Sequence, residues 1–172
     1  MGDVILVNEF DEPIGKMEKL EAHRQGLLHR AFSIFLFNKR GELLLQRRAA
    51  HKYHSGGLWT NTCCSHPEPG EDLNSAAKRR LMEELGVETG IRFDRSFIYQ
   101  AGFDNGLIEH EYDHIAIGEY DGLVRPNPDE VMDYQWTTGE ELKKWMSERP
   151  DDFTVWFLKI YEDRLIDNLS GL

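Results

Sequence analysis

Residues 65–87 read SHPEPGEDLNSAAKRRLMEELGV, a polar loop followed by the clearest helical pattern in the chain. Apolar residues at near-helical spacing predict a helix over residues 72–85. Asp72 or Asn74 is suited to cap its start, and Gly86 is suited to end it. Toward its end the helix carries two arginines followed by two glutamates. A cluster of carboxylates on one helix can hold Mg²⁺ against a diphosphate.

This stretch resembles the Nudix box, whose last part reads Arg-Glu-U-x-Glu-Glu-x-Gly-U, with U bulky and apolar. The matching residues are Glu71, Arg79, Leu81, Glu83, Glu84, Gly86 and Val87. Ser65 replaces the first glycine of the motif, and Arg80 replaces a glutamate. A guanidinium at this position suits pairing with phosphate oxygens and weakens the loading of several cations. The resemblance therefore implies a Nudix fold with altered chemistry.

The spacing alone fits a second interpretation equally well, an ordinary surface helix. In that case Arg79 and Glu83, and likewise Arg80 and Glu84, are i,i+4 ion pairs. Such exposed pairs contribute only about 0.3–0.5 kcal/mol each.

The bulk composition predicts one compact domain over residues 1–172. The chain is 40% hydrophobic and 11% aromatic, as in globular proteins. A formal net charge of -11 disfavours a nucleic-acid partner. Two cysteines, no basic N-terminal region and no long apolar run predict a cytoplasmic protein without a signal peptide or membrane partner. A monomer is the favoured oligomeric state.

The remaining pattern predicts a single α/β domain. Strands are expected at residues 4–7, 29–37, 43–48, 93–101, 108–120 and 131–136. Besides residues 72–85, helices are expected at residues 17–23, 140–147 and 154–169. Turns are expected around residues 10–15 and 38–42. Combined with the Nudix-like stretch, this order implies a mixed β-sheet sandwiched between helices.

The two cysteines, Cys63 and Cys64, are adjacent and are followed by His66. If residues 60–66 are extended, alternation places Cys64 and His66 on one face and Cys63 on the other. By the same rule Glu109 and Glu111 share one face of a later strand. With His23 and His29, these side chains supply three imidazoles and two carboxylates. That donor set suits Zn²⁺, Mn²⁺ or another first-row ion.

Six segments in order resemble the type 1 isopentenyl-diphosphate isomerases, a Nudix-fold family that isomerises instead of hydrolysing. They are HRAFSIFLF, LLLQRRA, GLWTNTCCSHP, the altered Nudix box, EHE and DEVMDYQW. The similarity extends over residues 4–156, and TNTCCSHP is among its more specific signatures.

The resemblance implies a role for each matching position. The implied ligands of a divalent metal are His23, His29, His66, Glu109 and Glu111. Glu84 falls where Mg²⁺ is held together with the substrate diphosphate. Cys64 and Glu111 match the proton-transfer residues, with Tyr99 and Trp156 lining the hydrocarbon pocket. The implied diphosphate-binding cations are Lys19, Arg48, Lys52 and Arg80.

The implied reaction converts isopentenyl diphosphate into dimethylallyl diphosphate by a 1,3-proton shift. Protonation of the alkene gives a tertiary carbocation, so the site has to exclude water and offer both a proton donor and a base. The π-face of Trp156 is suited to stabilise that cation by ~2 kcal/mol in a desolvated site. No organic cofactor is implied, only Mg²⁺ with the diphosphate and one further divalent ion (Mn²⁺, Zn²⁺ or Mg²⁺).

Two alternatives stay open at this stage. The first is a Nudix pyrophosphohydrolase acting on a nucleoside diphosphate derivative. Arg80 and the segment TNTCCSHP disfavour it. The second is a non-catalytic domain with a structural zinc ion on Cys63, Cys64, His66 and another histidine. Zinc-binding cysteines are usually separated by two or more residues, so the adjacent pair disfavours this second alternative.

Overall fold

A computed structural model describes residues 2–163 and contains one sheet of nine strands. The strands are β1 (Asp3–Val7), β2 (Pro13–Glu18), β3 (His29–Phe37), β4 (Leu43–Arg48), β5 (Trp59–Thr60), β6 (Cys63–Ser65), β7 (Ile91–Gly102), β8 (Ile108–Glu119) and β9 (Val131–Thr137). The α-helices are α1 (Lys19–Gln25), α2 (Leu73–Leu85), α3 (Gly139–Glu148) and α4 (Val155–Glu162), and Pro150–Asp152 forms a 3₁₀ turn. Within these residues, no helix has the length and apolar character needed to cross a bilayer.

Strand β3 is the centre of the sheet. It pairs in parallel with β8 and antiparallel with β1, β4 and β6, so the sheet is mixed, as expected. A strand with neighbours and layers on all sides has no solvent-facing side, which explains its nearly continuous apolar sequence. The parallel register sets His29 opposite Glu111, and the antiparallel register sets Ser33 opposite Cys64.

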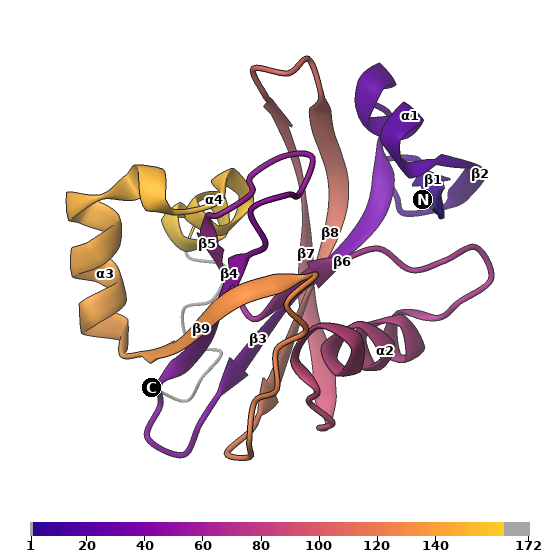
Figure 1. Ribbon diagram of the computed structural model, residues 1–172. Helices are drawn as coiled ribbons and strands as arrows, with labels where there is room; N and C mark the ends of the chain where they lie inside the picture. Colours follow the sequence, from indigo (N-terminus) through magenta and orange to yellow (C-terminus); the bar gives the residue numbers. More distant parts are fainter. Residues whose placement is uncertain (1, 164–172) are drawn as a thin grey trace.

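Helices cover both faces of the sheet (Figure 1), which confirms the predicted sandwich. On one face, Phe32, Ile34 and Leu36 of β3 pack with the buried residues of α2. On the other face, Phe35 and Phe37 pack with α3 and α4. The alternation along β3 therefore divides the hydrophobic core into two layers.

The Nudix-like helix forms as predicted. Asp72 caps α2 by accepting a hydrogen bond from the backbone N–H of Ser75, and Gly86 ends the helix with a left-handed φ of 61°. Arg79 forms a bidentate pair with Glu71, with both N···O distances at 2.8 Å. This pair fastens the polar loop to the helix that follows it.

Three expected boundaries were wrong or incomplete. The turn expected at residues 10–15 is shorter, because Pro13–Glu18 forms β2 against β1, and the first helix consequently begins at Lys19. The stretch over residues 60–66 is not continuously extended, since residues 61 and 62 separate β5 from β6. Of the helix expected at residues 154–169, Val155–Glu162 is helical, and residues 164–169 lie outside the described part of the chain.

Candidate active site

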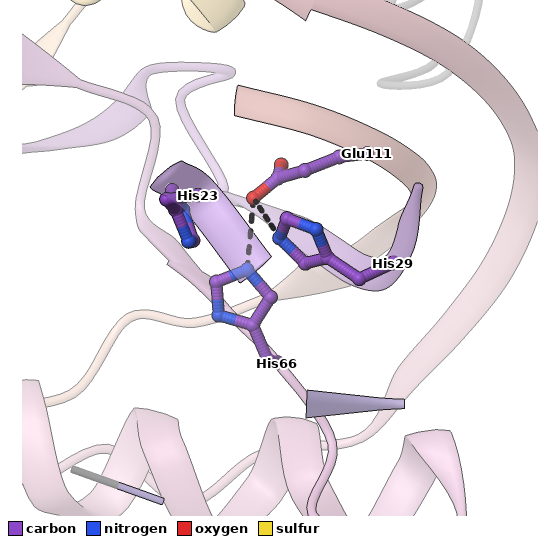
Figure 2. Close-up of side chains that lie close together, drawn as sticks. All are labelled: His23, His29, His66 and Glu111. Atoms are coloured by element: carbon purple, nitrogen blue, oxygen red, sulfur yellow. Dashed lines mark hydrogen bonds and ion pairs between the residues drawn. The ribbon is translucent and has the colours of Figure 1, made fainter. Parts of the chain in front are cut away.

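Three histidines from separate segments converge on one carboxylate. His23 comes from α1, His29 from the start of β3, His66 from just after β6, and Glu111 from β8. Their ligand atoms all lie within 4.8 Å of one another. Figure 2 shows the rings of His29 and His66 directed at the same Glu111 oxygen, at 3.6 Å and 2.8 Å.

The orientation of two rings fits a metal ion. The Nδ1 atoms of His23 and His29 lie 2.7 Å and 2.8 Å from the backbone oxygens of Lys19 and Leu27, so each Nδ1–H donates to a carbonyl. Both Nε2 atoms are buried without a hydrogen-bond partner. A metal-bound histidine characteristically donates its second ring N–H in this way. Burial also lowers the pKa of His23 and of His66, which keeps these rings neutral and able to act as ligands.

Glu109 lies beside this cluster, in a second group with His23 and His54. Its Oε1 is 3.9 Å from the Nε2 of His23 and 3.1 Å from the Nε2 of His54. The hydroxyl of Tyr99 lies 2.7 Å from an oxygen of Glu109 and 2.7 Å from an oxygen of Glu111. Burial and the two carboxylates raise the pKa of Tyr99, so the hydroxyl keeps its proton and donates to either carboxylate.

The adjacent cysteines face different layers. Cys63 is fully buried in the core beneath α2, whereas Cys64 packs with the α3–α4 layer and lines an inner cavity with His66. The predicted register is therefore confirmed. Neither thiol belongs to a group of converging metal-ligand atoms within the described residues, which removes the support for a structural zinc ion on both cysteines.

The thiol of Cys64 forms hydrogen bonds with two polar side-chain groups. It donates to Oδ1 of Asn61 at 2.9 Å and accepts the indole N–H of Trp156 at 3.0 Å. Burial, followed by the charge of Asp113, raises its pKa to about 12, so Cys64 is a neutral thiol at physiological pH.

Three residues near the site were missed from the sequence: His54, Asn61 and Asp113. Ser33 donates a 2.7 Å hydrogen bond to Asp113 and lies 3.6 Å from the sulfur of Cys64. Burial and the charge of Glu111 raise the pKa of Asp113 well above its usual value. Asp113 lies two positions after Glu111 on β8 and therefore on the same side of the strand as Glu109 and Glu111, which the sequence alone could have indicated. For His54 and Asn61, which lie in irregular segments, no periodicity was available.

The four predicted diphosphate-binding cations line two adjoining spaces, an inner cavity and a groove. Lys19 and Arg48 line the inner cavity, and Lys19, Lys52 and Arg80 line an adjoining polar groove. The residues shared by the cavity and the groove are Lys19, Tyr53, Ser65 and His66. Desolvation, with repulsion from Arg48, lowers the pKa of Lys19 to about 8. The guanidinium of Arg48 lies 5.2 Å from the ring centre of Trp156.

The arginine of the altered Nudix box is already paired. Arg80 donates at 2.6 Å to Glu83 and at 2.6 Å to Glu84, and it lies 3.4 Å from Glu130. Glu84 also accepts a 2.8 Å hydrogen bond from Gln46 and stands outside the two donor groups at the histidines. Of the six predicted metal ligands, four thus form the histidine cluster, Glu109 lies in the adjoining group that shares His23, and Glu84 lies in a separate place.

Comparisons with known proteins identify the family of this chain. Residues 27–157 match the family model described as the NUDIX domain. The isopentenyl-diphosphate Delta-isomerase of Burkholderia multivorans is 53% identical over 90% of this chain and 88% of its own. Isopentenyl-diphosphate Delta-isomerase 2 of Photorhabdus laumondii is 52% identical over 91% of this chain and 89% of its own.

Solved structures support the same fold. The DR0079 protein of Deinococcus radiodurans superposes with a TM-score of 0.71 at 24% identity, covering 85% of this chain and 89% of its own. The MutT protein of Methanosarcina mazei gives a TM-score of 0.63 at 20% identity, covering 82% and 96%. With a NUDIX domain over most of its length and relatives above 50% identity, the chain belongs to the isopentenyl-diphosphate Delta-isomerase family.

Proposed function

We propose that this chain converts isopentenyl diphosphate into dimethylallyl diphosphate by a 1,3-proton shift. One observation carries the proposal: a polar groove that contains Lys19, Lys52 and Arg80 adjoins a small buried cavity lined by both Cys64 and Glu111. The groove suits a diphosphate, and the cavity suits a short hydrocarbon chain that has to be kept from water. Lys19, which borders both spaces, stands where the two halves of such a substrate would join.

The proton shift is assigned to the two groups that face the cavity. A proton is added to the terminal alkene carbon, and a proton is removed from the carbon next to the C–O-bearing one, so no net proton is consumed. Cys64 and Glu111 carry these two transfers, and Tyr99 holds Glu111 through a 2.7 Å contact. Trp156 borders the same cavity, where its ring stabilises positive charge on the tertiary carbon.

The donors present fit one divalent ion, and a second is proposed to arrive with the substrate diphosphate. His23, His29, His66, Glu109 and Glu111 would hold the first, and their imidazole content favours Zn²⁺ or Mn²⁺ over Mg²⁺. Glu84 would hold Mg²⁺ together with the diphosphate, whose charge Lys19, Arg48, Lys52 and Arg80 also balance. The chemistry supplied by the ions is charge neutralisation at the diphosphate and a fixed orientation of Glu111.

The test is incubation with isopentenyl diphosphate and Mg²⁺ in deuterated water, followed by NMR of the product. Dimethylallyl diphosphate carrying deuterium is expected, because the transferred proton exchanges with solvent. Glu111→Gln is the matched control and is expected to give neither product nor deuterium exchange. Release of phosphate from nucleoside diphosphate derivatives, without any isomerised product, would instead establish the pyrophosphohydrolase alternative.

A further inference from the structure

We propose that His54 is a sixth protein ligand of the divalent ion at the histidine cluster. The residue was absent from the predicted ligand set, and it lies in the irregular segment between β4 and β5. It is 7% exposed, and its Nε2 is 3.1 Å from Oε1 of Glu109. The ligand atoms of His54, Glu109 and His23 lie within 4.8 Å of one another. Opposite donors around one ion are about 4.2 Å apart, twice a metal–nitrogen bond, so the three ligand atoms span little more than the diameter of one coordination shell.

The ring of His54 is held on several sides by aromatic side chains. It stacks on Phe103 with centroids 4.7 Å apart and planes 15° apart. It meets the rings of Tyr53 and Trp156 edge-on, at 4.5 Å and 5.8 Å. A buried imidazole fixed in this way has few alternative rotamers, so the direction of its Nε2 toward Glu109 is a defined feature of the site.

The hydrogen bonding of His54 is compatible with the pattern of His23 and His29, because the hydroxyl of Ser55 can accept from Nδ1–H. Its Nδ1 lies 3.3 Å from the hydroxyl of Ser55, as the other two Nδ1 atoms lie near carbonyl oxygens. An Nδ1–H donated to Ser55 leaves the lone pair on Nε2, the atom near Glu109. Ser55 itself has a φ of 52°, a left-handed conformation that costs a non-glycine residue energy and places the hydroxyl beside the ring.

A sixth protein donor has a chemical consequence. The two donor groups share His23, and if both close on one ion they would supply four imidazoles and two carboxylates, enough for an octahedral shell without a water molecule. A site that has to protect a carbocation from water gains from an ion without exchangeable water. Four nitrogen donors also shift the preference toward Zn²⁺ and its first-row neighbours and away from Mg²⁺. The inference shares with the proposed function only the metal site at these histidines. Its test therefore measures the coordination of the metal ion and not turnover.

The experiment compares Co²⁺-loaded wild type with His54→Gln by visible absorption. The wild type is expected to show the weak bands of six-coordinate Co²⁺, and the variant the several-fold stronger bands of a five-coordinate ion. Competition with a chelator is expected to show Co²⁺ binding weakened about 10–100-fold or more. Affinity alone would not distinguish a ligand from a residue that only orients Glu109, so the absorption spectrum decides. Identical spectra for wild type and variant would overturn the proposal.

His54→Cys keeps the test conclusive if the glutamine variant does not fold. A thiolate bound to Co²⁺ gives an intense charge-transfer band in the near ultraviolet, which is expected only if residue 54 reaches the ion. Loaded His54→Cys without that band would contradict the proposal. The matched control is His51→Gln, an exposed histidine of the same segment, whose Co²⁺ spectrum is expected to equal that of the wild type. A protein that binds Co²⁺ as described but does not isomerise would refute the proposed function and leave this ligand assignment intact.

Discussion

Trp156 donates its indole Nε1–H to the sulfur of Cys64 at 3.0 Å, a bond that joins α4 to β6 at the inner cavity. The same ring faces the guanidinium of Arg48 at 5.2 Å. Trp156 thus has two separable functions in the proposed reaction, as a π-face toward the cation and as a hydrogen-bond donor that orients the thiol.

Trp156→Phe is expected to separate the two functions, because phenylalanine keeps an aromatic face and lacks the N–H. Loss of one hydrogen bond to the thiol, about 1 kcal/mol, should lower kcat about fivefold with little change in KM. Trp156→Leu, which also removes the π-face, should lower kcat much further. Steady-state kinetics of both variants provide the measurement. Trp145→Phe is the matched control, since the Trp145 indole donates at 2.7 Å to Asp152, away from the cavity. Equal losses in Trp145→Phe and Trp156→Phe would point to a general packing effect.

Substrate affinity should depend on pH through Lys19. Its pKa is lowered to about 8, so the free protein carries this charge below that pH and loses it as the pH rises further. A diphosphate prefers the charged amine, and KM should therefore rise above about pH 8, by at most about tenfold per pH unit. Arginine stays protonated throughout this range, so Lys19→Arg should show a flat KM profile from about pH 7 to 9. The same rise in both proteins would assign the dependence to another group.

Glu130 is expected to compete with the substrate diphosphate. Its Oε2 forms a close ion pair with Lys52 and lies 3.4 Å from Arg80, so this carboxylate competes with a phosphate for two of the four predicted cations. Glu130→Gln should free Lys52, leave Arg80 with Glu83 and Glu84, and lower KM about two- to fivefold, the range of a partly exposed ion pair, with kcat unchanged. Asp129→Asn is the matched control because it removes the same charge from the next residue, which also lines the groove. A higher KM in Glu130→Gln would show that this carboxylate assists binding.

The parts of the site that follow from strand alternation were predictable from the sequence. The two-residue period separates Cys63 from Cys64, and it places Glu109 and Glu111 together on β8. Helix capping likewise predicted the end of α2 at Gly86 and its start at Asp72 or Asn74, of which Asp72 is the cap. These are local rules, and they hold because each side chain's direction depends only on its own strand or helix.

Features that depend on contacts between distant segments were not predictable in this way. His54 approaches Glu109 from an irregular segment fifty-five positions earlier, and its place depends on the ring of Phe103 and the turn at Ser55. Strand β2 was missed because its mostly exposed residues have no apolar alternation, and pairing with β1 decides its structure. Arg80 was expected to be free for phosphate, but three nearby carboxylates pair with it, two of them from its own helix.

The adjacent cysteines provide the sharpest test of the site. Cys64→Ala removes the thiol that faces the cavity and should lower kcat by the ~10²–10⁴-fold typical of a lost general acid or base. Cys63→Ala should keep most activity, because this side chain is buried beneath α2, and should lose about 1 kcal/mol of unfolding free energy through the small cavity left. Cys64→Ser should retain a trace of the rate, since a hydroxyl can still relay a proton. Kinetics and denaturant unfolding of the variants, measured side by side, give each protein its own signature. An inactive Cys63→Ala beside an active Cys64→Ala would mean that Cys63 is the working thiol and that the assignment of these two residues is reversed.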